Sequence, residues 1–298
     1  MYNNTKDNSF KGYIILSRKE TLSEQFKNFY KEHNPKSMED ALEKFAIFGG
    51  VSWGKIDTSK PSYELIEKLI LNDYSYIRND ITELTDGQPL YHSILSAIAM
   101  SDGKAHAVYK RARVEESVGE KAIETLIERG LIRLKRCKGA DDKFSFTLPF
   151  LRFWFAFVSP LFKGIRDGEY TEVKERWQAY ENEFTHPIFT ELSHALLRKL
   201  LKDEQIMEMG EYWKNDGLSL DIYANTKDKK RIIGSCKYTN TKVKKSELSK
   251  LAELAQKANI DADMIVIIAK SGFSKELKAL KNEQLRLFTL KNFKTLVE

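Results

Sequence analysis

The sequence has only two cysteines, Cys137 and Cys236, which lie far apart along its 298 residues. No CxxC pair and no Cys/His spacing of a zinc ligand set is present, so neither a structural zinc site nor a disulfide framework is indicated. The most apolar stretch, FWFAFVSPLF, is far shorter than the ~20 residues that span a bilayer. The first residues also lack the apolar core of a secretory signal. We therefore expect a cytoplasmic protein with reduced thiols and no membrane partner.

The sequence lacks a large excess of one charge sign. The formal net charge is +6, with 31% charged residues and a pI of about 9.0. This balance permits nucleic acid as a partner without requiring it. Hydrophobic residues make up 42% of the chain and aromatic residues 11%, which is enough to build real cores. The length favours two or three domains.

Four segments follow one another along the chain. Residues 1–87 show apolar side chains at helical spacing, as in TLSEQFKNFYKEH and SMEDALEKFAIF. Residues 88–160 predict three short helices and a hairpin, which is the order of a winged helix-turn-helix. Residues 161–183 predict a connecting helix, and residues 184–298 alternate helices with apolar strands. The predicted fold class is multidomain, α and then α/β with a mixed sheet.

The predicted winged helix carries side chains that can neutralise phosphates. The candidate DNA-binding residues on its second helix and its wing are Lys110, Arg111, Arg113, Arg133, Lys135, Arg136 and Lys138. The third helix, which would read the DNA groove, is acidic instead, with Glu116, Glu120, Glu124 and Glu128. The wing favours DNA contact and the third helix argues against it. Winged helices also dock proteins, so both alternatives stay open.

A dense aromatic run, LRFWFAFVSP, follows the predicted wing. Exposed aromatic rings can stack on bases, but this run has almost no polar residue. Such density is typical of a core between domains. We expect these rings to be buried.

Two strands near the end of the chain place an acid and a lysine as metal-dependent nucleases do. LSLDIYA contains Asp221, and RIIGSCKY contains Lys237 two residues after Ser235. Because side chains alternate along a strand, Ser235 and Lys237 share the site face and Cys236 points into the core.

Phosphodiester cleavage needs a divalent cation held by oxygen ligands and a polarised water, which the lysine would position. Two carboxylates normally hold the cation, but the second place is occupied by the neutral Ser235. We expect Asp221 alone to bind Mg²⁺ or Mn²⁺ weakly. An ordinary salt bridge between Lys237 and Asp221 is the simpler interpretation of the same pattern.

A second candidate motif is GGVSWGKI, from Gly49 to Ile56. Its glycines and lysine fit a phosphate-binding P-loop, but Ile56 stands where Ser or Thr ligates Mg²⁺. A P-loop protein also has an apolar strand that ends in an acid, the Walker B acid. No such strand follows nearby. We therefore expect no nucleotide-binding module in this chain.

Several segments together resemble a known family: FGGVSW, PLYHSILSAIA, LIERGLI, LRFWFAFVSP, PIFTEL, YWKNDGLSLDIYA, GSCKY and KSGF. From about Phe45 to the end, the chain resembles the C-terminal part of the archaeal-type AAA+ ATPase family. That resemblance implies a helical lid, a winged helix and a PD-(D/E)XK (restriction-endonuclease-like) nuclease domain. It also implies that the P-loop ATPase module is missing here.

The chain departs from the family pattern at the acids. The family pattern implies a phenylalanine-glutamate pair where this chain has Phe189 and Thr190, with Glu191 one position later. It implies a further acid where Ser219 stands, and a glutamate in place of Ser235. Asp221 and Lys237 remain. Glu191 is thus the candidate displaced acid, and it would serve only if its helix rotated.

Three functions compete at this stage. We favour a DNA-binding protein whose nuclease-like domain is degenerate and inactive. The first alternative is an active Mg²⁺- or Mn²⁺-dependent nuclease that uses Asp221, Lys237 and Glu191. The second is an interaction subunit for a separately encoded P-loop ATPase, docked through the helices that precede Gln88.

Overall fold

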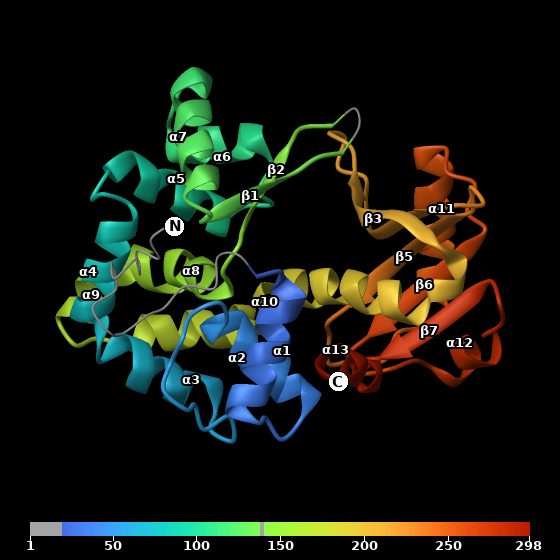
Figure 1. Ribbon diagram of the computed structural model, residues 1–298, viewed down its shortest axis with the longest axis horizontal. Helices are drawn as coiled ribbons and strands as arrows, with labels where there is room; N and C mark the ends of the chain where they lie inside the picture. Colours follow the sequence, from blue (N-terminus) through green and yellow to red (C-terminus); the bar gives the residue numbers. More distant parts are fainter. Residues whose placement is uncertain (1–19, 138–139) are drawn as a thin grey trace, which may run out of the picture.

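The computed structural model describes residues 20–137 and 140–298. A helical half and a half built around a sheet are bridged by one long helix, α10 (Thr171–Leu200), as Figure 1 shows. Among the described residues, no helix is both long and apolar enough to cross a membrane.

The N-terminal part of the helical half is made of short helices. They are α1 (Leu22–His33), α2 (Met38–Phe48), α3 (Ser62–Ile66), the π-helical turn η1 (Glu67–Leu71) and α4 (Tyr74–Leu84). Ser37 caps α2, because its hydroxyl accepts the Asp40 N–H at 3.0 Å. Gly49–Ile56 follows helix α2 rather than a strand, so this segment lacks the strand–loop–helix context of a P-loop.

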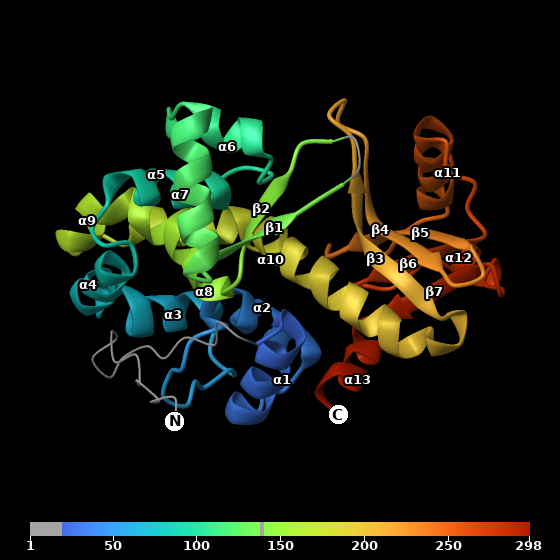
Figure 2. The ribbon, with the colours of Figure 1, turned by 45° about the horizontal axis from the view of Figure 1, so that its top comes forward.

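Three helices and a hairpin come next, in the predicted order. They are α5 (Pro89–Ala99), α6 (Ala105–Ala112), α7 (Glu116–Glu128), β1 (Ile132–Lys135) and β2 (Lys143–Phe146). The two strands pair antiparallel with Lys135 opposite Lys143. Both Figure 1 and Figure 2 show the hairpin reaching from the helical half toward the sheet.

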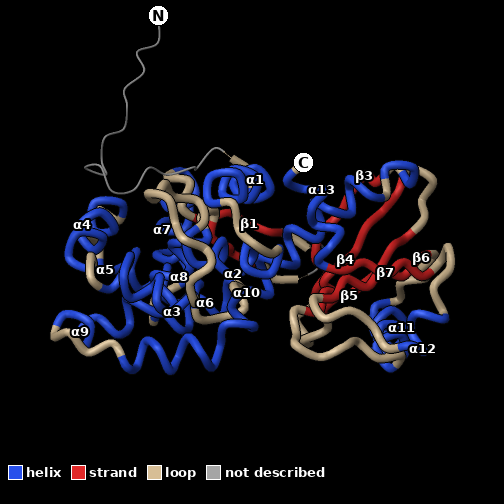
Figure 3. The backbone as a smooth tube through the Cα atoms, turned by 90° about the horizontal axis from the view of Figure 1, so that it is seen from below, coloured by secondary structure: helices blue, strands red, loops and turns tan. Residues whose placement is uncertain are grey.

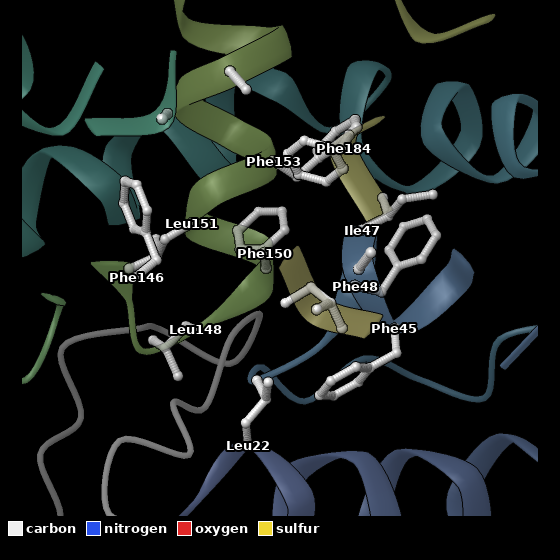
Figure 4. Close-up of a cluster of buried hydrophobic side chains, with 14 of the residues drawn as sticks. Leu22, Phe45, Ile47, Phe48, Phe146, Leu148, Phe150, Leu151, Phe153 and Phe184 are labelled. Carbon is white, nitrogen blue, oxygen red and sulfur yellow. The ribbon is translucent and has the colours of Figure 1, made fainter. Parts of the chain in front are cut away.

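The aromatic run forms α8 (Pro149–Phe153), the π-helical turn η2 (Trp154–Val158) and a 3₁₀ turn, η3 (Ser159–Leu161), before α9 (Phe162–Arg166). The prediction that its rings are buried is confirmed, since Phe150, Phe153 and Trp154 are at most 2% exposed. Figure 4 shows Phe150 and Phe153 beside side chains of α2 and beside Phe184 of α10. The Phe153 and Phe184 ring centroids are 6.0 Å apart. This core therefore joins segments far apart in the sequence.

Helix α10 is one continuous helix of 30 residues, although the sequence predicts two helices that meet near Phe184. Pro187 lies inside it, where the ring removes one backbone hydrogen bond and crowds the preceding turn. The Arg152 guanidinium donates to the Phe184 carbonyl at 2.7 Å, within that turn. A polar partner from α8 thus supports the helix where proline weakens it.

The second half contains a mixed sheet, as predicted, and the sheet has five strands. In chain order its elements are η4 (Lys202–Glu204), β3 (Ile206–Trp213), β4 (Ser219–Thr226), β5 (Arg231–Lys237), α11 (Ser246–Ala258), β6 (Met264–Ala269), α12 (Lys275–Ala279), β7 (Leu285–Thr289), η5 (Leu290–Phe293) and α13 (Lys294–Val297). The strand order is β3-β4-β5-β6-β7, with the first two pairs antiparallel and the last two parallel. Strand β3 was not predicted, because Glu208, Gly210 and Glu211 hide the apolar alternation of this edge strand.

Helices cover both faces of the sheet. Helix α10 packs on β3, β4 and β5 from one side, and α11 packs on β4 and β5 from the other. Figure 3 shows α11 and α12 on one side of the strands and α13 on the opposite side. On β5, Cys236 is fully buried on the α10 face, while Ile233 packs in the cluster that includes Leu251 of α11. The next residues on the Ile233 face are Ser235 and Lys237.

The central strands leave no room for a side chain at Gly234. A Cβ atom built there presses on the Val266 carbonyl oxygen of the parallel strand β6. Gly234→Ala is expected to lower the free energy of unfolding by about 1–3 kcal/mol, as overpacking does. The measurement is chemical denaturation. Gly210→Ala in β3 is the matched control, because its Cβ meets nothing within 4 Å, and it should change stability by less than about 0.5 kcal/mol. Equal stability of the two variants would contradict this packing.

Candidate functional site

A cavity of about 250 Å³ lies where β4 and β5 meet α11. Its polar side chains come from Ser219 and Asp221 on β4, Ser235 and Lys237 on β5, and Glu247 and Lys250 on α11. Ser235 and Lys237 therefore lie on one face of β5, as strand alternation predicts. The cavity brings together four residues that the sequence singled out, Ser219, Asp221, Ser235 and Lys237, and adds a carboxylate that it did not.

Asp221 is held by the neighbouring strand. Its Oδ2 accepts the backbone N–H of Cys236 at 2.8 Å. This bond crosses from β4 to β5 at the end of their paired register, which runs from Ile222–Gly234 to Asn225–Arg231. A half-buried carboxylate that is fixed by a backbone donor has a defined orientation before any ligand arrives.

Lys237 pairs with Glu247 rather than with Asp221. The Lys237 Nζ lies 2.9 Å from Glu247 Oε1, and their side chains are 25% and 14% exposed. Glu247 stands in the first turn of α11, where a helix N-terminus favours negative charge. Sequence reasoning missed Glu247 because it looked for an acid on strands and on the preceding helix. The signal available was a carboxylate in the first turn of the helix that follows the Lys237 strand.

The Ser235 hydroxyl is buried, at 4% exposure, and its Oγ has no hydrogen-bond partner within the described part of the chain. An unsatisfied buried hydroxyl costs about 1–3 kcal/mol. Since it lines the cavity, a polar ligand atom or a water there would satisfy it.

Two histidines of α10 support the strands that carry the site. His194 Nε2 lies 2.6 Å from the Asp221 carbonyl oxygen, and His186 Nε2 lies 2.9 Å from the Cys236 carbonyl oxygen. A carbonyl only accepts, so each Nε2 carries the hydrogen and donates it. Burial lowers the pKa of His194, which favours the neutral ring.

Glu191, the displaced acid suggested by the sequence, does not line the cavity. Its carboxylate pairs with the Arg133 guanidinium of the hairpin and lies 3.7 Å from Lys135 Nζ. Lys135 is 2.7 Å from Glu211 of β3, and Lys143 is 3.8 Å from the same carboxylate. We call Arg133, Lys135, Lys143, Glu191 and Glu211 the hairpin ion cluster. Arg133 and Lys135, both predicted DNA ligands, are thus engaged within the molecule.

The other predicted DNA-binding residues that the structure describes are more exposed to solvent than Arg133 and Lys135. Lys110, Arg111 and Arg113 are exposed at the end of α6. Arg136 is 77% exposed, with its Nε 3.8 Å from Asp142. Lys138 lies outside the described residues.

The far end of the hairpin is joined to the end of β3. The Trp213 indole N–H donates to the Asp141 carbonyl at 2.8 Å, and the Cys137 thiol donates to the Trp213 carbonyl at 3.3 Å. Lys143 Nζ also lies 4.5 Å from the Trp213 ring centroid. The hairpin therefore contacts the sheet along its length rather than projecting freely.

The donors in the cavity suit a hard cation. Mg²⁺ is commonly held by one or two carboxylates, with waters and substrate phosphate completing its coordination. Asp221, Glu247 and the unpartnered Ser235 hydroxyl offer such a partial set. The described residues contain no group of three or more His, Cys, Asp or Glu side chains that could hold a metal. A closed site of zinc type is therefore not formed by them, while a Mg²⁺ or Mn²⁺ site completed by substrate fits.

Comparison with known proteins gives one family match. Residues 154–250 match the model of DUF234, described as archaea bacterial proteins of unknown function. This family is associated with ATPase-related proteins of archaea and bacteria. The match covers less than half of the chain, but it includes Asp221, Ser235, Lys237 and Glu247. No curated protein and no solved structure matches the chain significantly.

The hairpin ion cluster makes a pH-dependent contribution to stability. Burial raises the pKa of Glu211, but Lys135 and Lys143 outweigh it and bring the pKa from 4.5 down to about 2. Because the folded pKa is the lower one, the contribution is complete above about pH 4.5 and is lost as the pH falls toward 2. Glu211→Gln should cost about 1–3 kcal/mol of unfolding free energy at neutral pH.

The measurement is denaturant unfolding of wild type and Glu211→Gln across acid pH. Their difference should shrink steadily below about pH 4.5. Glu208→Gln, on the exposed side of the same strand, is the control and should follow wild type. A difference that stays constant down to pH 2 would show that Glu211 is not held as an anion by the hairpin.

Proposed function

We propose that this chain cleaves phosphodiester bonds of nucleic acid with Mg²⁺ or Mn²⁺ in the cavity between β4, β5 and α11. The observation that carries the proposal is the position of Glu247. Its carboxylate lies 2.9 Å from Lys237 Nζ in the cavity that Asp221 also lines. It supplies a second carboxylate where Ser235 leaves the strand without one.

Each residue has a role that follows from its contacts. Asp221 and Glu247 would hold the cation, which when bound polarises the phosphate and lowers the pKa of a water. The Cys236 N–H keeps the Asp221 carboxylate in place through a single oxygen. Lys237 stabilises the Glu247 carboxylate at rest and can orient a water or a phosphate oxygen during cleavage. His194 and His186 fix the carbonyls of the two strands from behind.

A basic surface next to the cavity supports nucleic acid as the substrate. The segment between β5 and α11 carries the exposed Lys242, Lys244 and Lys245, and Lys250 lines the cavity itself. Lysines in this arrangement neutralise phosphates without reading bases. We therefore place the phosphate-binding surface here rather than on Arg133 and Lys135, which the hairpin ion cluster occupies.

The second candidate function is DNA binding without cleavage, the function favoured from the sequence. The neutral Ser235 favours it, because a serine hydroxyl carries no charge and is a poorer ligand for a cation than the carboxylate normally found there. It would use the same lysines, with Lys110, Arg111 and Arg113 on α6 as a second contact. The ATPase partner implied by the family resemblance stays a prediction.

Nicking of supercoiled plasmid in Mg²⁺, Mn²⁺ or EDTA tests the proposal. Asp221→Asn, Glu247→Gln and Lys237→Met should each reduce metal-dependent nicking by about 100-fold or more, since each removes a group acting on the reacting phosphate. Glu253→Gln, on the exposed side of α11, is the matched control and should nick like wild type. Plasmid binding without nicking by wild type would establish the second function instead, and nicking that survives all three substitutions would refute the proposed site.

Glu191→Gln separates Glu247 from the acid that the sequence suggests. Glu191 lies in the hairpin ion cluster, so nicking should stay within about twofold of wild type while thermal stability falls. The readouts are nicking rate and melting temperature on the same preparation. Loss of nicking equal to that of Glu247→Gln would return Glu191 to the site.

A further inference from the structure

Helices α6 and α7 and the hairpin enclose a groove of about 970 Å³, on the face where a winged helix would read DNA. Figure 2 shows these elements side by side in the helical half. The carboxylates that line the groove are Glu116, Glu120, Glu124, Glu128, Asp141 and Asp142. Arg136 and His106 are the basic residues in the same lining, and Arg136 is already near Asp142.

The floor of the groove is apolar. Ile123 and Ile127 of α7, Leu134 of β1 and Phe144 of β2 line it, together with Tyr109 of α6. Gly119 lets α7 approach this tyrosine closely, because a Cβ there would lie 2.5 Å from its ring. An apolar floor with a charged rim is the anatomy of a surface that buries an amphipathic segment.

The rim of the groove carries far more acidic residues than the rest of this basic chain would suggest. The chain as a whole carries a net charge of +6, yet the exposed glutamates of α7 repeat every four residues along one stripe. Like charges at this spacing repel each other and weaken the helix. Burial, with Glu120, Glu116 and Asp142 adding to it, raises the pKa of Tyr109 to about 12. With six carboxylates in its lining and Arg136 as the only arginine or lysine among the described residues there, the groove carries an excess of negative charge, which repels phosphates.

We propose that this groove binds a basic amphipathic segment of a partner protein. Lysine or arginine side chains of the partner would pair with the carboxylate rim, and its apolar side chains would cover Ile123, Ile127 and Leu134. Charge complementarity selects this occupant over a nucleic acid, since the rim would meet the phosphate backbone with like charge. This docking is independent of cleavage in the cavity beside α11.

The full chain is titrated with a fluorescein-labelled peptide of about 18 residues, long enough for five helical turns. The peptide has lysines along one face and leucines along the other, and its fluorescence polarisation is measured. Saturable binding that weakens with salt is expected, because screening acts on exposed charges. Glu120→Lys with Glu124→Lys should weaken binding about tenfold or more. A peptide with glutamates in place of lysines should not bind.

Glu32→Lys with Glu83→Lys is the matched control, because both residues are exposed on other helices and the change in net charge is the same. This control should bind the peptide within about twofold of wild type. No saturable binding by wild type, or equal binding by both double variants, would overturn the proposal. Duplex DNA binding or self-association lost specifically in the Glu120/Glu124 variant would overturn it in favour of DNA or of a second copy of this chain.

Discussion

The hairpin ion cluster is the interaction that holds the β1–β2 hairpin of the helical half against α10 and the edge strand of the sheet. Three basic side chains of the hairpin form ion pairs with two carboxylates outside it. Arg133 pairs with Glu191 of α10, and Lys135 and Lys143 pair with Glu211 of β3. Partly buried charges of one sign are stable only beside charges of the other. The cluster therefore fixes the hairpin on the sheet, and the same basic residues are removed from any phosphate they would otherwise contact.

The order of helices and strands could be predicted from the sequence wherever the signal comes from residues that are close together along the chain. The three helices, the hairpin and the buried aromatic run carry periodicity or density that depends on neighbouring residues alone. Strand β3 and the continuity of α10 could not be predicted in this way. From the sequence, Glu208 and Glu211 would be expected to face solvent. In the structure, the Glu211 carboxylate pairs instead with Lys135 and Lys143, which lie far away along the chain. Pro187 signals an end to a helix, but Arg152 and the surrounding core support the turn around it.

The candidate site shows a similar division. The strand pattern was sufficient to place Asp221, Ser235 and Lys237 on one cavity, since alternation and pairing decide which side chains share a face. The carboxylate partner of Lys237 was not accessible to that reasoning. Glu247 comes from a helix that crosses over the end of β5, and its distance from Lys237 depends on how α11 packs. The cavity beside Ser235 therefore contains a carboxylate that comes from a helix rather than from the strand.

The uninterrupted α10 has a mechanical consequence. Trp177 and Phe184 of this helix pack against Phe153 and Phe157 of the aromatic run. Farther along the helix, His186 and His194 donate hydrogen bonds to the backbones of β5 and β4. Because both histidines belong to the same helix, a displacement of α10 would shift β4 and β5, the two strands that line the cavity, together.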